Sequence, residues 1–465
     1  MSGSAAAAAS SSNLDSFINQ VQSLSANGAT SQLSDLLRLA CADNGGVLVE
    51  HAQHLDNALQ TLDLQQHSAA VAAILYCKLI TSATNNANQL AIIRAQIAEF
   101  VGGCSAEQIR AIPDIYCAVF RKLTDLLLHK NEAYLGIPIV CKAIDALQST
   151  PTQLTSIHAD LCCLCLKARI VKPAIRFLDA DIDTILRESN APPHFDAKAF
   201  LSYYYYGGMI YALLKNFDRA LYFFEVVLTT PATAVSSIMI EAYKKYIIIG
   251  LMQTGKAPQL PSYRSPVVQR NIKPMCQAYN DLSDAVTNAH SSNVTPLNAV
   301  KEMLETKHRA VYAQDNNTGL VKLLVDSMVR ANIKRLTSSF LTLSLVDVAN
   351  RCKLAGGPAE AEQYLVSMIA ENQINATIDH SRGMVSFHDR VTVGHSQKDL
   401  AASIEECLQL EAKLKSLDTE TLLNPTFVNK ASRSGGGGML SHDDEGFGGT
   451  AAGSSDMVLD FLSGM

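Results

Sequence analysis

The stretch that decides the fold is LTLSLVDVANRCKLAGGPAEAEQYLVSMIAENQINATIDHSRGMVSFHD, residues 341–389. Near its start, Ser344 lies three residues before Asp347, a spacing at which two side chains can satisfy the free amides of a helix start. This helix is expected to end at the glycine pair 356–357. Pro358 suits the first turn of a second helix, because its missing N–H costs nothing there. Two short consecutive helices are therefore predicted.

The second helix and the residues after it have different hydrophobic periods. The apolar residues of the helix recur at steps of three and four and form one stripe: Ala361, Tyr364, Leu365, Met368 and Ile369. The period then changes to two, with Ile374, Ala376 and Ile378 before a turn at 381–383, and Val385 and Phe387 after it. Alternation on both sides of a turn predicts a β-hairpin. Two helices followed by a hairpin are typical of a winged helix.

Upstream of this module the sequence repeats one unit, an amphipathic helix, a polar or Gly/Pro break and another helix. The clearest copy is YYYYGGMIYALLKNFDRALYFFEVVLTTP, residues 203–231, which resembles a tetratricopeptide repeat. The matching positions are Tyr204, Gly208, Tyr211, Ala220 and Phe224, with Pro231 one residue early. Other copies are less regular. We therefore predict a mainly α protein, with a degenerate TPR-like helical-repeat solenoid over residues 14–318 and a winged-helix (α+β) subdomain after it.

The remaining boundaries follow from composition. Residues 1–13 are rich in Ala and Ser and are expected to be disordered, and a linker helix together with the winged helix is expected over 319–392. Residues 425–465 are predicted to form a flexible, acidic, Gly/Ser-rich tail. In this tail Ser441 precedes the acidic run 443–445, so it is a candidate for phosphorylation by an acid-directed kinase.

A C-terminal helix is predicted over residues 395–420. Its apolar residues lie on one stripe with coiled-coil-like steps: Leu400, Ile404, Cys407, Leu410, Leu414 and Leu417. A lone helix cannot bury such a stripe. The stripe is expected either to dock on the winged helix of its own chain or to join a bundle with partner chains.

Residues 341–389 resemble the PCI domain, the winged-helix module shared by scaffold subunits of the proteasome lid, the COP9 signalosome and a translation initiation factor. The matching residues are Ser344 to Ala349, Ala361 to Leu365, Met368, Ile369, and Ile374 to Asp379 leading to Val385. Over its whole length, tail included, the chain resembles signalosome subunits. This resemblance implies a non-catalytic scaffold in a large PCI/MPN complex, which removes the ubiquitin-like modifier Nedd8 from cullins and so regulates cullin-RING ubiquitin ligases.

The resemblance also implies interaction sites. PCI winged helices can associate edge to edge, so the hairpin is a candidate for strand pairing with a neighbouring subunit. Its candidate interface residues are Ile374, Ile378, Val385 and Phe387. In the signalosome, C-terminal helices of several subunits form a bundle, which implies partner-chain contacts for the stripe on residues 395–420.

Composition narrows the class of protein. The 465 residues exceed one compact core, and the net charge of −6 gives no electrostatic footprint for nucleic acid or an anionic membrane. The 11 cysteines are odd in number and mostly lie in apolar helical runs, unlike a secreted disulfide framework. No signal peptide and no apolar stretch of about 20 residues is evident. We expect an intracellular protein with no membrane partner, and the resemblance to signalosome subunits implies the cytoplasm and nucleus.

Three motifs could carry chemistry, and each has a simpler interpretation. Residues 250–256 spell most of a phosphate-binding loop, but Ala257 replaces the hydroxyl residue that would hold Mg²⁺. The cysteines at 162, 163 and 165 have no second pair at zinc spacing and read as a buried helix face. His51 and His54 lack an evident third ligand. We therefore predict no catalytic residue, no cofactor and no metal site.

A winged helix can also bind DNA through its second helix. Residues 358–372 carry Glu360, Glu362 and Glu371 and no Lys or Arg, so this helix would repel phosphate. The nearby cations precede the module: Lys322, Arg330, Lys334 and Arg335. No nucleic-acid partner is expected. Two alternatives stay open, a PCI scaffold subunit of the proteasome lid and a stand-alone PCI adaptor that binds protein or nucleic acid.

Overall fold

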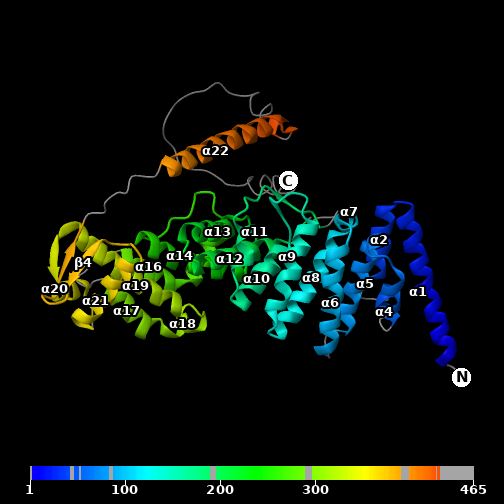
Figure 1. The fold of residues 1–465 in the computed structure, drawn as a ribbon, viewed down its shortest axis with the longest axis horizontal. Helices are drawn as coiled ribbons and strands as arrows, with labels where there is room; N and C mark the ends of the chain where they lie inside the picture. Colours follow the sequence, from blue (N-terminus) through cyan, green and yellow to red (C-terminus); the bar gives the residue numbers. More distant parts are fainter. Residues whose placement is uncertain are drawn as a thin grey trace. The chain divides into compact units, whose positions relative to one another are not determined.

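The computed structural model describes residues 3–41, 47–51, 54–82, 87–188, 195–287, 296–354, 356–388, 397–425 and 427–429. The chain divides into two compact units, with the boundary between Val325 and Asp326. The first unit is an array of helices that lie side by side in chain order (Figure 1). The second unit contains a small three-stranded sheet and ends in a long helix. The mainly α fold class predicted from the sequence is confirmed.

The first half of the array contains α1 to α9. Their bounds are α1 Gly3–Ala26, α2 Thr30–Ala40, α3 Val47–Glu50, α4 Leu55–Thr61, α5 Ser68–Ser82, α6 Ala87–Gly103, α7 Ala106–Ala111, α8 Pro113–His129 and α9 Ala133–Leu147. Because α1 begins at Gly3, the structure has a helix over most of the segment 1–13, where the sequence predicted disorder. Five consecutive alanines at 5–9 favour this helix, since Ala has the highest helix propensity of all residues.

The second half of the array contains α10 to α18 and the start of α19. The bounds are α10 Ile157–Ala168, α11 Lys172–Leu178, α12 Ala197–Leu213, α13 Phe217–Thr229, α14 Ser237–Thr254, η2 Val268–Ile272, α15 Lys273–Met275, α16 Gln277–Thr287, α17 Pro296–Glu302, η4 Met303–Lys307, α18 Arg309–Gln314 and α19 Thr318–Ser339. Two short strands, β1 Gln153–Leu154 and β2 Thr184–Ile185, pair in parallel beside α10 and α11. Helices α8, α10, α12 and α14 pack each on the next, as in a two-helix repeat.

The hairpin of α12 and α13 shows why the repeat residues occur where they do. A Cβ at Gly208 would lie 2.8 Å from the ring of Phe224, so only glycine lets the two helices approach this closely. Tyr211, Ala220 and Phe224 are all buried between the helices. Asn216 caps α13, its Oδ1 accepting a hydrogen bond from the backbone N–H of Arg219. The tetratricopeptide-like spacing therefore corresponds to one tightly packed helix pair.

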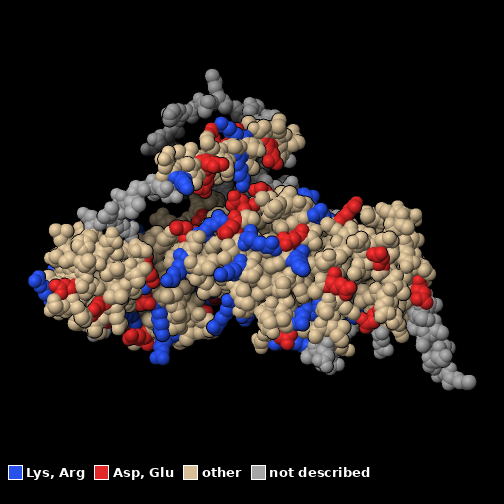
Figure 2. All heavy atoms as spheres, viewed as in Figure 1, with Lys and Arg blue, Asp and Glu red and all other residues tan. Residues whose placement is uncertain are grey.

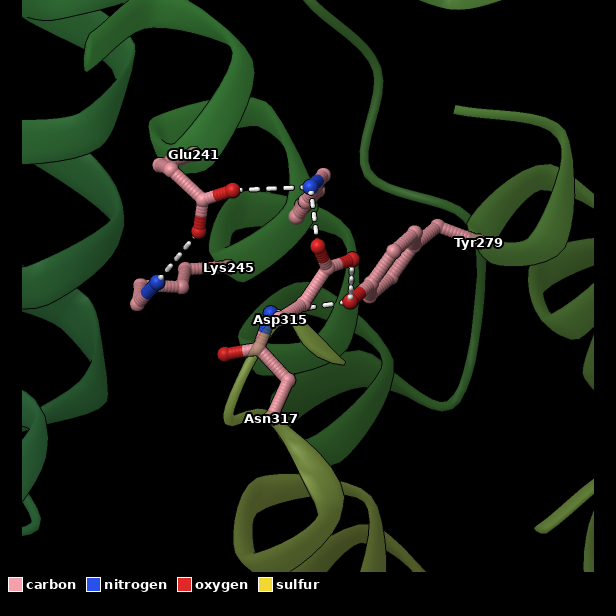
Figure 3. A network of polar contacts seen from close by, with 6 residues as sticks. Glu241, Lys245, Tyr279, Asp315 and Asn317 are labelled. Carbon is pink, nitrogen blue, oxygen red and sulfur yellow. Dashed lines mark hydrogen bonds and ion pairs between the residues drawn. The ribbon is translucent and has the colours of Figure 1, made fainter. Parts of the chain in front are cut away.

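A polar network ties α14 to the helices that follow it (Figure 3). Lys244 Nζ lies 2.7 Å from Glu241 Oε1 and 2.8 Å from Asp315 Oδ1. Tyr279 Oη donates to Asp315 Oδ2 (2.8 Å), and Asn317 Nδ2 donates to Tyr279 Oη (2.8 Å). The side chains of Lys244 and Asp315 are only 13% and 16% exposed, so their pairing is partly shielded from water. The network fixes the turn from which α19 starts.

The second unit is built on the C-terminal part of α19. Its elements are β3 Thr342–Ser344, α20 Leu345–Cys352, α21 Gly357–Ala370, β4 Ala376–Asp379, β5 Met384–Phe387 and α22 Gln397–Leu423. The sheet order is β3-β5-β4, with both pairings antiparallel. The predicted winged helix is thus present, and β3 is a strand that the sequence analysis did not predict. Ser344 caps α20 as expected, its Oγ accepting from the N–H of Asp347 (3.0 Å).

Candidate interaction surfaces of the second unit

The hairpin candidates divide between the interior and the surface of the module. Ile374, Val385 and Phe387 are buried and form its core together with Leu365, while Ile378 is half-buried. These side chains pack under the sheet and are not available to a partner. The backbone N–H and C=O groups on the outer edge of β4 are available, because β4 pairs only with β5 among the described residues. The outer edge of β4 is therefore a template for a further strand.

The turn between β4 and β5 holds this edge in a fixed shape. Asp379 Oδ1 accepts hydrogen bonds from Ser381 N (3.0 Å) and Oγ (2.6 Å) and from Arg382 N (3.3 Å). These bonds, led by that of the Ser381 hydroxyl, lower the pKa of Asp379. His380 Nδ1 lies 3.1 Å from Glu362 Oε1 on α21, which anchors the tip of the hairpin to the helix. An edge that is ordered before binding loses less entropy on association.

The acidic residues of α21 are used within the module. Glu360 Oε2 accepts from the N–H of Gly356 (2.7 Å), so it caps its own helix. Glu362 contacts the hairpin tip, and Glu371 forms an ion pair with Arg330 of α19. No Lys or Arg lies on α21, so the helix that would enter a DNA groove presents only negative charge. This geometry favours a protein partner.

The helix α22 presents the second candidate surface. Every described residue from 397 to 425 whose side chain is placed is exposed. The predicted stripe is therefore uncovered, with Leu410 55% exposed; its members are Leu400, Ile404, Cys407, Leu410, Leu414 and Leu417. A contiguous apolar face of this length is typical of a helix that is covered by another protein.

The motifs examined for chemistry lie in structural positions. Residues 250–256 end α14, with Gly255 in the left-handed conformation (φ +67°), so they form a helix terminus and not a phosphate loop. Cys162 and Cys165 are buried in α10, and burial raises the pKa of the Cys165 thiol to about 12. His51 lies in the short connection between α3 and α4. Over the described ranges, no three His, Cys, Asp or Glu side chains are grouped so as to hold a metal ion.

The phosphorylation candidate Ser441 lies outside the described residues, as does most of the predicted tail. Among the helices that the structure describes, none is both long and apolar enough to cross a membrane.

Comparison with known proteins identifies the family. A family model described as COP9 signalosome complex subunit 3, N-terminal helical repeats, matches residues 9–268, and the PCI domain model matches residues 305–389. The chain belongs to the COP9 signalosome complex subunit 3 family. A Drosophila melanogaster member with that name is 38% identical over 90% of this chain and 94% of its own length. A Dictyostelium discoideum member is 31% identical over 84% of this chain and 91% of its own.

The family matches agree with the elements of the structure. The helical-repeat match ends at Val268, where α14 and its loop give way to η2. The PCI match begins in η4 and so includes α18 and all of α19 upstream of the winged helix. The resemblance of residues 341–389 to the PCI domain is confirmed.

Proposed function

We propose that this chain is a non-catalytic scaffold subunit of the COP9 signalosome. The observation that carries the proposal is the uncovered apolar stripe of α22, placed directly after a PCI module with an open sheet edge. A chain with two such surfaces is suited to be held by neighbouring subunits. The curated relatives that it matches over most of its length are named as COP9 signalosome subunits.

In this role the chain positions neighbouring subunits and catalyses no reaction. The helical array offers a long surface, the β4 edge pairs with a neighbouring module, and α22 enters a bundle of partner helices. By holding these partners the chain supports removal of Nedd8 from cullins, and thereby the regulation of cullin-RING ligases, without performing the reaction. We place this activity in the cytoplasm and nucleus as part of the same proposal.

The test replaces Leu410 and Leu414 together by Glu in the full-length chain. Two charges on the stripe should prevent burial against a partner, since an unpaired buried carboxylate costs several kcal/mol. The matched control places two Glu at Gln409 and Ser416, on the opposite face of the same helix. We expect the stripe variant to lose co-purification with the large complex and the control to retain it. Unchanged incorporation of the stripe variant would overturn the proposal.

A further inference from the structure

The loop after α14 carries an unbalanced positive charge. Residues 242–280 contain six Lys or Arg and no Asp or Glu, in a chain whose net charge is −6. Lys244 and Lys245 are paired with carboxylates of the network described above. The other four cations lie in residues 256–275, a segment that includes η2 and α15 and is here called the basic loop: Lys256, Arg264, Arg270 and Lys273.

These four cations have no acidic partner among the described residues. Arg264 donates only to neutral acceptors, the carbonyl of Pro261 and the side chain of Gln269. Lys256, Arg270 and Lys273 are exposed, and no ion pair joins them to a described carboxylate. On the face seen in Figure 2, Lys and Arg side chains are spread over the middle of the array with Asp and Glu among them. Four cations within one short loop create a positive potential that attracts anionic groups.

The basic loop is held in shape by α13 and α14. Pro258 packs closely on Gly250, because a Cβ added at Gly250 would lie 2.5 Å from the proline ring. Tyr246 Oη donates to the carbonyl of Gln259 (3.3 Å), and Ser265 N donates to Leu228 O at the end of α13 (3.4 Å). The loop also contains four prolines, which restrict its backbone further. A loop ordered in this way loses little entropy when it binds.

Two large exposed side chains lie in the same segment as the cations. Tyr263 is 71% exposed and Met275 is 63% exposed. Tyr, Met and Arg are the residue types enriched at protein–protein interfaces. A single aromatic ring does not form the stacking series that single-stranded nucleic acid requires. One carboxylate lies beside the residues that precede the loop, since Asp218 accepts a hydrogen bond from Gln253 at the end of α14.

We propose that the basic loop docks a short acidic segment of a partner polypeptide. Carboxylates of the segment would pair with Arg264, Arg270 and the two lysines, and an apolar side chain between them would pack on Tyr263 and Met275. The basic loop belongs to the helical array and is not part of the PCI module or of α22. The inference therefore goes beyond the proposed scaffold function and does not depend on it.

The experiment measures binding of fluorescent probe peptides to the isolated full-length chain. One probe alternates pairs of Glu with single Phe residues, a second has Gln in place of every Glu, and a third probe is oligouridylate. We expect only the acidic peptide to bind, with an affinity that falls as salt is raised. The double variant Arg264→Glu/Arg270→Glu should weaken this binding at least tenfold, while the control Lys334→Glu/Arg335→Glu on α19 should not.

Three results would overturn the proposal. The first is that the acidic peptide does not bind, and the second is that it binds the loop variant as tightly as the control variant. The third is tighter binding of oligouridylate than of the acidic peptide, which would assign the surface to nucleic acid. Unchanged melting temperatures of the variants show that the fold is intact. Because no other subunit is present, failure here is distinct from failure of the scaffold proposal, which is read from co-purification.

Discussion

At the scale of single residues, Asp160 is a carboxyl group in a setting that disfavours its charge. Its Oδ2 atom is enclosed and has no hydrogen-bond partner. Arg121 favours the ionised form, but Asp125, Glu188 and Asp196 oppose it. Burial is the largest cause, and the pKa of Asp160 is raised to about 7. The residue is therefore poised to exchange a proton near neutral pH.

This predicts that stability falls as the pH rises. The folded-state pKa of Asp160 lies above its unfolded value, so its contribution is fully present below pH 4 and is lost as the pH passes through about 7. Asp160→Asn should remove this dependence and stabilise the chain at pH 8 by about 1–3 kcal/mol. Urea denaturation at pH 6 and pH 8 measures it. Asp145→Asn, in an exposed ion pair with Arg176, should keep the wild-type pH dependence.

Lys215 is a second residue whose conformation lowers the free energy of unfolding, and a substitution can remove this effect. It lies in the turn between α12 and α13 at φ +61°, a left-handed conformation that costs a side-chain-bearing residue about 1 kcal/mol. Lys215→Gly should raise the free energy of unfolding by about 0.5–1 kcal/mol. Asn216→Gly, one position later, removes the cap of α13 and should not stabilise. Thermal melts of both variants measure these effects. A rise or a fall of the melting temperature in both variants alike would contradict this account.

At the scale of elements, the network around Lys244 joins α14 to the turn that starts α19. Lys244→Met would leave Asp315 partly buried without its cation. We expect a loss of about 2–4 kcal/mol, because removing one partner of a shielded ion pair leaves an uncompensated charge. The control Lys307→Met breaks a pair whose lysine side chain is 57% exposed and should cost about 0–1 kcal/mol. If denaturant titrations gave the same loss in free energy of unfolding for both variants, the network would contribute no more to stability than an exposed ion pair.

The elements also show what a sequence can predict. The winged helix was predictable because each part has a local cause, the Ser344 cap, the 357–358 helix start and the alternation around Gly383. Strand β3 was not predictable, since its three residues become a strand only by pairing with β5, whose residues lie 40 to 44 positions later in the chain. Likewise the pattern of α22 predicted an apolar stripe, but whether its own chain covers that stripe is a tertiary property. Burial of Val385 and Phe387, which had been interface candidates, is of the same kind.

At the scale of the whole molecule, the stability of the isolated chain should be independent of α22. Its stripe is exposed, so Leu410→Ser/Leu414→Ser should leave the melting temperature unchanged. Leu365→Ala, in the buried core of the winged helix, should cost about 2–5 kcal/mol. Calorimetry of the full-length chain separates the two. A marked destabilisation by the serine pair would mean that α22 docks on its own chain after all.

The order of strands in the sheet has a mechanical consequence. The chain enters the winged helix through β3 and leaves it through β5, and these strands are paired, with Phe387 N donating to Leu341 O (2.7 Å). A pull between α19 and α22 would load the β3–β5 hydrogen bonds one after another, as a zipper opens, and not all at once. Strand β3 would peel away first, while β4 remained paired with β5. Tension in an assembly would thus uncover a second strand edge before the module unfolded.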